Sequence, residues 1–284
     1  MKVALIQLCA SRDHDENVET VCDYLEQAGK AGARYAQTPE MTTLIERDRK
    51  RLSAQVTAER VADAQSRFSA IAAKHAMTVH IGSMAVPLSD GRFGNRAHLF
   101  GPNGAMVAHY DKIHMFDVDL DNGESWRESA IYAPGDRCVV ARATEGGPQI
   151  GLGICYDLRF ASLFRAQAQT GADLITAPAA FTRQTGQAHW HVLLRSRAIE
   201  TGSFMLAAAQ AGTHADGRET YGHSLVIDPW GTVLAEKTDD QPGLLIAEVG
   251  LEAVAAARSK IPALQHDRAF SIDAVDARPA QAVA

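Results

Sequence analysis

The chain has 284 residues, with 28 basic and 34 acidic side chains and a formal net charge of −6. This mild acidity argues against nucleic acid or an anionic membrane as a partner, because both bind through a concentrated basic face. The 22 glycines and 10 prolines exclude collagen-like and low-complexity chains. A chain of this length buries about three quarters of its unfolded surface, so it needs no disulfide scaffold.

The four cysteines, Cys9, Cys22, Cys138 and Cys155, are widely spaced and form no CxxC pair. This spacing argues against a zinc ribbon and a thioredoxin-like redox site. The apolar run 3–10 is too short to span a bilayer, and no signal-peptide cleavage pattern follows it. We therefore expect free thiols in a cytoplasmic protein, and ask whether any of them has a chemical role.

Short apolar segments typical of strands alternate with amphipathic helical segments along nearly the whole chain. The spacing predicts helices over 17–32, 55–75, 160–171, 189–201 and 251–260. It predicts strands over 3–8, 35–38, 78–82, 97–100, 106–111, 138–143, 149–154, 174–178, 204–209, 225–228, 232–236 and 244–248. Segment 117–134 has no periodicity and is interpreted as a long loop, a kind that is often functional.

One internal similarity bears on the architecture. Segment Leu99–Ala108 resembles Val226–Ala235, and both indicate a strand, a Pro-x-Gly turn and a second strand. Chance recurrence of a common turn is one interpretation, and two related half-sheets packed face to face is the other. With helices outside both sheets, the second gives an α/β fold of the four-layer αββα type. No composition change marks a linker, so we expect one domain over 1–270 and an extended tail over 271–284.

Cys155 is the candidate nucleophile. A glycine-containing strand runs into it, and a helical pattern begins within five residues. Backbone N–H groups at such a strand-to-helix turn bind anions and favour the thiolate form of a cysteine. The alternative is a small buried apolar residue, which is the usual role of a free cysteine. For the other three cysteines that alternative is favoured.

A thiol that attacks a carbonyl needs a base and a group that stabilises the oxyanion. Glu40 follows a short strand that stops at Pro39, and active sites of open α/β sheets gather at such strand ends. Lys112 ends the first hairpin, where a desolvated ammonium would stabilise both a thiolate and an oxyanion. Taken singly, each residue has a favoured alternative: Glu40 as a solvated loop acid, and Lys112 as an edge lysine with an exposed head.

Three segments together carry a resemblance. Thr38–Glu40, Asp111–His114 and Gly153–Phe160 resemble, in that order, the signature motifs of the nitrilase, or carbon–nitrogen hydrolase, superfamily. The similarity extends from Val3 to about Arg268. It implies the four-layer αββα sandwich and a cysteine-dependent amidase that forms a thioester intermediate. It also implies no cofactor and no metal.

The resemblance assigns roles to particular residues. Glu40, Lys112 and Cys155 match the catalytic positions, and the backbone N–H of Tyr156 is expected to hold the oxyanion. Glu128 matches the second glutamate of the family and is expected to support Lys112 and the substrate. One departure is Ala161-Ser162, where relatives commonly have Pro-Glu, and it leaves the start of the following helix and a salt bridge uncertain.

Within the superfamily the chain is most similar to deaminated-glutathione amidases, through Gly186–Trp190, Leu193–Thr201, Tyr221–Ser224 and Asp228–Gly231. This similarity implies hydrolysis of deaminated glutathione to 2-oxoglutarate and cysteinylglycine. An ω-amidase acting on 2-oxoglutaramate or 2-oxosuccinamate, a nitrilase, and a non-catalytic scaffold or binding protein remain the alternatives. Arg183 and Thr185, which follow the strand 174–178, are candidates for binding the substrate's carboxylates.

Two expectations concern assembly and metals. The resemblance implies a homodimer or higher homo-oligomer formed through the helix from Phe160, the helix 189–201 and the tail. His189 and His191 lie two residues apart on a predicted helix and therefore on different faces, which argues against a zinc site built from this pair.

Overall fold

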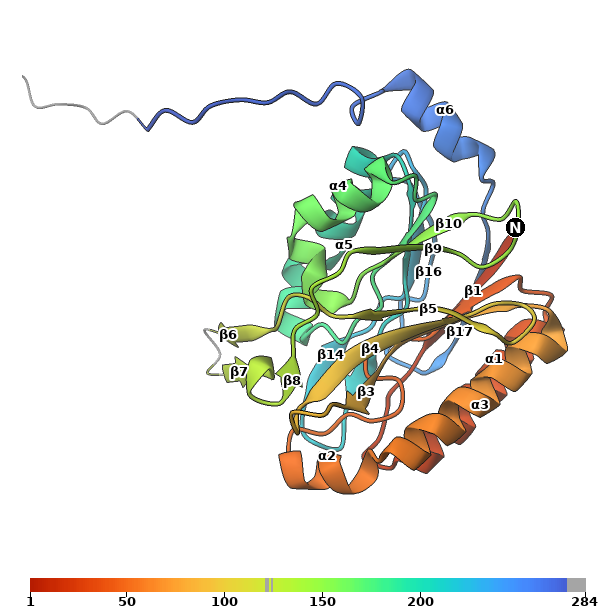
Figure 1. The fold of residues 1–284 in the computed structure, drawn as a ribbon, viewed down its shortest axis with the longest axis vertical. Coiled ribbons are helices and arrows are strands. Elements are labelled where there is room, and N and C mark those ends of the chain that lie inside the picture. The colour runs from red at the N-terminus through yellow and green to blue at the C-terminus, as the bar shows by residue number, and fades with distance from the viewer. Residues whose placement is uncertain (121–122, 124, 275–284) are drawn as a thin grey trace, which may run out of the picture.

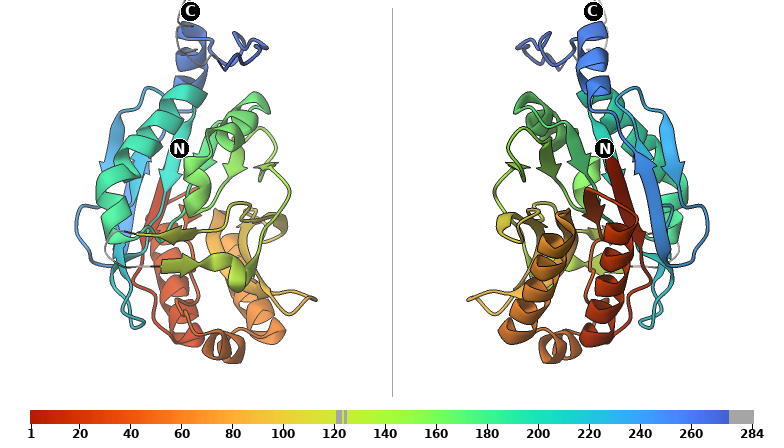
Figure 2. Two further views of the ribbon diagram at one scale, coloured as in Figure 1. Left: turned by 90° about the vertical axis from the view of Figure 1, so that its left-hand side faces the viewer. Right: turned by 90° about the vertical axis from the view of Figure 1, so that its right-hand side faces the viewer.

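The computed structural model describes residues 1–120, 123 and 125–274. Two sheets form the centre of the molecule, and helices lie on their outer sides (Figure 1, Figure 2). The helices are α1 (His14–Lys30), α2 (Arg49–Gln55), α3 (Ala58–His75), α4 (Ala161–Gln169), α5 (Arg183–Thr201) and α6 (Glu252–Lys260), with 3-10 turns η1 (Glu128–Ala130) and η2 (Cys155–Arg159). This mixed α/β arrangement confirms the predicted fold class.

Within the described residues the first sheet has seven strands, in the order β17-β1-β2-β3-β4-β5 with β8 beside β4. The strands β1, β2 and β3 are parallel; β17, β4 and β5 join the sheet antiparallel to their neighbours, and β8 pairs in parallel with β4. Its members are β1 (Lys2–Gln7), β2 (Tyr35–Gln37), β3 (Thr78–Pro87), β4 (Phe93–Phe100), β5 (Met106–Asp111), β8 (Tyr132–Ala133) and β17 (Gly243–Glu248).

The second sheet has six strands in the described residues, in the order β16-β15-β12-β11-β10-β9. Its central strands β10, β11 and β12 are again parallel. Its members are β9 (Val139–Arg142), β10 (Gln149–Leu152), β11 (Leu174–Thr176), β12 (Phe204–Ala207), β15 (Leu225–Ile227) and β16 (Val233–Glu236). Two small antiparallel pairs lie outside both sheets, β6 (Asp117–Asp119) with β7 (Ser125–Arg127) and β13 (Ala211–Thr213) with β14 (Glu219–Tyr221).

Alternation along β1 shows how the layers are filled. Val3 and Leu5 belong to the buried cluster that includes the second sheet, and Ala4 and Ile6 belong to the cluster beneath α1 and α3. Successive side chains of a strand point to opposite faces, so this strand is apolar on both because both are covered. Helices α4 and α5 cover the second sheet, with the buried Phe164 as one of their contacts.

The two similar segments of the sequence form matching hairpins. Leu99 pairs with Ala108 in the β4–β5 hairpin, and Val226 pairs with Ala235 in the β15–β16 hairpin, with a register shift at the following residue in both. The strands β10-β11-β12-β15-β16 also repeat the order and directions of β1-β2-β3-β4-β5. This geometry favours two related half-sheets over chance recurrence of a turn.

Several predicted boundaries were wrong. Segment 117–134 is not without structure, since its described residues form β6, β7, η1 and β8. Helix α5 begins at Arg183, six residues before the predicted start, because Thr182 caps it by accepting from the N–H of Thr185. Helix α4 begins at Ala161 even though Phe160 offers no side-chain cap, so the Ala161-Ser162 departure leaves the helix start in place.

The last residues that the structure describes are irregular. Residues 271–274 have no regular structure, and the rest of the predicted tail, 275–284, lies outside the described residues. Among the helices of the described ranges, none combines the length and the apolar character that crossing a bilayer requires.

Candidate active site

The carboxyl ends of β2 and β10 and the end of β5 meet at a cavity of about 220 Å³. Glu40, Lys112, Glu128, Cys155 and Tyr156 all line it. The structure therefore brings together the five predicted residues of the catalytic set, which come from four separate segments of the chain.

Cys155 lies at the first position of η2, directly after β10, and is buried. Its φ of 49° is in the left-handed region, which is uncommon for a residue with a Cβ and marks local strain. Its backbone N–H donates to the carbonyl of Pro178 at 2.9 Å. A thiol held on such a sharp turn points away from its own strand and into the cavity that it lines.

Asp157 ties this turn to the segment that carries Lys112. Its side chain is fully buried and accepts hydrogen bonds from the Tyr110 hydroxyl at 2.7 Å and from the Ile154 N–H at 2.9 Å. It also accepts from the backbone N–H of His114 at 3.1 Å and lies 2.7 Å from the ring nitrogen Nδ1 of the same residue. Four contacts to one carboxylate fix the position of the turn relative to β5.

Lys112 lies between two carboxylates. Its Nζ is 2.8 Å from Oε1 of Glu40, and 3.0 and 2.8 Å from the two oxygens of Glu128. Asn95 bridges the same two carboxylates with its amide nitrogen at 3.0 Å from each. The other oxygen of Glu40 accepts from the backbone N–H of Ala180 at 2.9 Å. Every polar atom that holds Glu40 is therefore a donor, which keeps its carboxylate ionised.

The ionisation of the three central groups follows from burial and mutual contact. Burial opposes the charge of Glu40, but the Lys112 ammonium and hydrogen bonds from Cys155, Lys112 and Asn95 together hold its pKa below the ordinary value. Burial likewise opposes the charge of Lys112, yet the charges of Glu128 and Glu40 raise its pKa well above the usual range. Burial and the adjacent Glu40 raise the pKa of Cys155. These pKa shifts favour a neutral Cys155 thiol in the resting site, beside an ionised Glu40 carboxylate that is paired with the Lys112 ammonium.

Sequence reasoning missed three parts of this site. Asn95 lies in β4 beside Lys112, whose N–H donates to the Asn95 carbonyl at 3.0 Å. Asp157 falls within the third motif, and Ala180 lies two residues after the predicted strand 174–178, but neither position predicts a contact to the site. The available signal for Asn95 was a polar amide in a strand segment whose other residues, apart from Arg96 and His98, are glycine or apolar.

The two predicted substrate-binding residues lie differently. Thr185 lines the cavity, but its hydroxyl is 2.8 Å from that of Thr182 in the cap of α5. Arg183 is not among the lining residues; its guanidinium is paired with Asp240 at 3.0 Å and with Glu219 at 3.7 Å. The placement of Arg183 therefore does not support a role in binding substrate, because two carboxylates already occupy its guanidinium.

Arg159 is a cavity cation that the prediction did not assign to substrate. Its guanidinium lies over the rings of Tyr156 and Phe181, 5.8 and 5.5 Å from their centroids, and contacts the His189 ring nitrogen at 3.3 Å. Among the described residues no carboxylate lies within 4.0 Å of it. A guanidinium in this setting offers its donors to a carboxylate from outside the protein.

An α/β sandwich with a buried thiol, a carboxylate and an ammonium at one cavity defines a class of hydrolytic enzymes that attack carbonyl carbon through sulfur. The chain belongs to the carbon–nitrogen hydrolase family, whose family model matches residues 2–259. It is an amidase-type enzyme of that family.

Curated relatives cover nearly the whole chain. A deaminated glutathione amidase of Synechocystis is 36% identical over 266 residues, which are 93% of this chain and 96% of that protein. The deaminated glutathione amidase of Homo sapiens is 36% identical over 94% of this chain and 82% of its own length. An ω-amidase of Mus musculus is 33% identical over 94% of this chain and 95% of its own.

Solved structures of relatives share the fold. The C. elegans NitFhit protein superposes with a TM-score of 0.87 at 30% identity over 94% of this chain, which spans 65% of that longer chain. An amidase from Nesterenkonia sp. AN1 superposes with a TM-score of 0.76 at 29% identity over 92% of this chain and 98% of its own. In that structure, a glutamate-to-glutamine mutant, acrylamide has added to the active-site cysteine.

Proposed function

We propose that Cys155 is the nucleophile of an amide hydrolase and that Glu40 is its general base. The observation that carries this proposal is the buried Glu40 carboxylate, which lines the same cavity as the buried Cys155 thiol and is paired through Oε1 with Lys112 at 2.8 Å. Because the thiol is neutral at rest, its proton passes to Glu40 as sulfur bonds to the amide carbon. The negative charge of the Glu40 carboxylate thereby passes to the former carbonyl oxygen, next to Lys112.

The oxyanion is held by the Lys112 ammonium and the backbone N–H of Tyr156, both at the cavity wall. One preorganised donor of this kind is worth about 3–4 kcal/mol in the transition state. Protonated Glu40 then gives its proton to the leaving amine as the C–N bond breaks, and a thioester on Cys155 remains. Water attacks the thioester, loses a proton to Glu40, and the acid departs while the thiol is restored. Glu128 holds Lys112 in position throughout.

For the substrate we propose a small carboxylated amide, with deaminated glutathione as the first candidate. Its support is the similarity to deaminated glutathione amidases at 36% identity, together with the cations of the cavity. Arg47 and Arg218 lie 3.7 and 4.3 Å from the ring centroid of Trp126, and both guanidinium groups are within 4.0 Å of the Asp216 carboxylate. Arg159, beside Tyr156, is therefore the cavity cation that best suits a substrate carboxylate.

A side-by-side assay tests this proposal. Deaminated glutathione, 2-oxoglutaramate and a small nitrile are incubated with the enzyme at equal concentration, and acid, amine or ammonia release is measured. We expect the largest kcat/KM with deaminated glutathione and no turnover by Cys155→Ala, with a thioester on the wild-type chain in intact-mass spectra. A preference for 2-oxoglutaramate would make the enzyme an ω-amidase, and turnover by Cys155→Ala would contradict the nucleophile assignment.

We also propose that the chain self-associates through the outer face of α5. Val192 and Ile199, seven residues apart on that helix, are 69% and 56% exposed, and Trp230 in the adjacent β15–β16 turn is 56% exposed. Apolar side chains gathered in this way favour a protein interface. A Val192→Asp/Ile199→Asp variant is expected to halve the mass measured by light scattering; an unchanged mass would contradict this face as the interface.

A cytoplasmic location suits the mechanism, because it keeps Cys155 reduced.

A further inference from the structure

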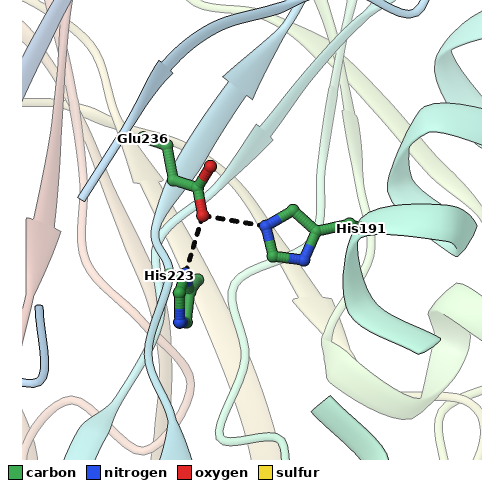
Figure 3. A group of neighbouring side chains, drawn as sticks. All are labelled: His191, His223 and Glu236. Carbon is green, nitrogen blue, oxygen red and sulfur yellow. Dashed lines mark hydrogen bonds and ion pairs between the residues drawn. The ribbon is translucent and has the colours of Figure 1, made fainter. Parts of the chain in front are cut away.

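A cluster of two histidines and one glutamate lies outside the candidate active site. His191 comes from α5, His223 from the segment just before β15, and Glu236 from the end of β16 (Figure 3). β15 and β16 pair with Leu225 opposite Glu236, which places this carboxylate beside His223. Two of the three groups are thus set by one strand pair, and the third by the helix that packs on it.

The three side chains converge on one point (Figure 3). Oε1 of Glu236 is 2.8 Å from Nε2 of His191 and 2.7 Å from Nδ1 of His223. All three ligand atoms lie within 4.8 Å of one another. The imidazole rings are inclined at 72° with centroids 5.4 Å apart, so their nitrogens approach the carboxylate from two directions rather than stacking.

Neighbouring contacts hold His223 in this orientation. The ring of Tyr221 stacks on it, with centroids 4.2 Å apart and an inclination of 23°. Trp190 donates its indole N–H to the His223 carbonyl at 2.9 Å, and His223 itself has a φ of 56°. A left-handed residue with a side chain is strained and persists only where its surroundings fix it. This backbone is therefore held in place by contacts beyond the hydrogen bond to Glu236.

The chemistry of the set is that of a transition-metal ligand group. Two imidazole nitrogens and one carboxylate oxygen bind Zn²⁺ in many enzymes and leave a fourth position open, whereas Mg²⁺ and Ca²⁺ prefer oxygen alone. The side chains of His191, His223 and Glu236 are 33%, 21% and 22% exposed, so an ion can reach them from solvent. We propose that His191, His223 and Glu236 form a binding site for a divalent transition-metal ion, with Zn²⁺ as the representative ligand.

Binding requires modest movement and no redox step. With metal–ligand distances of about 2.0–2.1 Å, tetrahedral ligands lie about 3.3 Å apart. The two nitrogen–oxygen separations lengthen by about half an ångström from 2.8 and 2.7 Å, which side-chain rotation provides. A metal ion takes the lone pair of Nε2 of His191 and of Nδ1 of His223, so each metal-bound ring carries its N–H on the other nitrogen. None of the three residues lines the active-site cavity, so the metal-site proposal is tested independently of the amidase proposal.

Zinc titration of the full chain tests the proposal. Cys155→Ser serves as the background, because it removes the thiol of the other site that could compete for the ion. Zn²⁺ is titrated against a chromophoric chelator, and bound metal is measured by mass spectrometry after gel filtration. We expect about one ion per chain in this background, in keeping with a single three-ligand site. A His191→Ala/His223→Ala variant should bind more than about 100-fold more weakly, since even the loss of a group behind a ligand costs 10–100-fold.

His75→Ala is the matched control, because His75 lies 2.9 Å from Glu26 in a histidine–carboxylate pair that no second histidine joins among the residues that the structure describes. This control should bind zinc as tightly as the background. Substitution by Co²⁺ should give the strong visible absorption of a tetrahedral site in the background and in the control, and lose it in the double variant. The proposal is overturned if the background binds no zinc, if the double variant binds it equally well, or if His75→Ala loses it too.

Discussion

Removing the cation of the candidate active site separates its structural role from its chemical one. Lys112 is almost completely buried between two carboxylates, with Nζ 2.8 Å from an oxygen of each. Lys112→Met keeps most of the side-chain volume and leaves Glu40 and Glu128 facing each other without a counter-charge. Breaking one partner from a buried ion pair destabilises a protein by about 3–5 kcal/mol. We expect the free energy of unfolding to fall by that amount in urea titrations.

The same change removes an oxyanion donor. We expect kcat/KM to fall by about 10²–10³ or more, which corresponds to the 3–4 kcal/mol that such a donor supplies. Loss of activity alone does not distinguish the two roles, because a destabilised site can also be distorted. A second substitution makes the distinction, since it repairs the charge without restoring the ammonium.

Lys112→Met/Glu128→Gln is that variant. Two carboxylates and one ammonium give the resting site a net charge of −1, which becomes −2 in Lys112→Met and returns to −1 in the double variant. A glutamine at 128 still accepts the hydrogen bond from the Phe116 N–H, now at 2.7 Å from the carboxylate. We expect at least half of the lost stability to return while kcat/KM stays low, with Glu128→Gln alone as the matched control. Recovery of activity in step with stability would show that Lys112 acts only as a structural counter-ion.

Two further predictions concern pH and substrate charge. Burial, and then the neighbouring Arg96, lowers the pKa of His98 to about 3, so the unfolded chain takes up a proton near pH 6.5 that the folded chain refuses. The free energy of unfolding therefore decreases as the pH is lowered below about 6.5, and at pH 5 this histidine alone accounts for a loss of about 2 kcal/mol. In urea titrations at pH 7 and pH 5, His98→Gln should lose about 2 kcal/mol less than the wild type between the two pH values. Equal losses in the two proteins would contradict this assignment. Arg159→Gln should raise KM for a carboxylated amide about tenfold or more, from a charge-assisted bond of about 1.5–3 kcal/mol, with little effect on a neutral amide of similar size. Equal losses on both substrates would show that Arg159 supports the fold of the cavity instead.

The order of three motifs predicted the centre of the site, and spacing alone did not. Glu40, Lys112 and Cys155 are each ambiguous locally, because a loop acid, an edge lysine and a buried cysteine are common. The donors around Glu40 are invisible at short range: Asn95 is 55 residues away and Ala180 is 140. Their roles follow from how two sheets pack, which periodicity does not encode.

The choice between two arginines shows the same limit. Arg183 and Arg159 both flank apolar segments near a predicted strand end. Asp240, which lies 57 residues after Arg183, decides the outcome by occupying its guanidinium at 3.0 Å. The same limit applies to the strands. Those that were predicted well contain apolar runs. The short strands β6, β7, β8, β13 and β14 have only two or three residues each, so they form through pairing with a neighbouring strand rather than through a pattern of their own.

The relation between the two halves of the chain leads to a last prediction. Glu40 follows β2 and Pro178 follows β11, which are equivalent strands of the two sheets. Gly82 of β3 lies where these segments meet: a Cβ there would come within 2.1 Å of the Thr38 carbonyl and 2.5 Å of the Pro178 side chain. One segment carries the base, and the other accepts the N–H of Cys155 at 2.9 Å. Contact at this junction therefore sets the distance between base and nucleophile.

Gly82→Ala should force these segments apart. Overpacking of this kind lowers the free energy of unfolding by about 1–3 kcal/mol, which leaves the protein folded, so we expect the main effect on kcat. A shift of about 1 Å in a catalytic group costs roughly 10²-fold in rate, so a loss of that order is expected in a folded protein. Gly29→Ala is the control, because its Cβ would meet the His75 ring at 2.2 Å between α1 and α3, and neither residue lines the active-site cavity. It should destabilise the chain without a comparable loss of kcat. Equal losses of activity in the two variants would mean that general destabilisation, rather than the spacing of Glu40 and Cys155, limits the reaction.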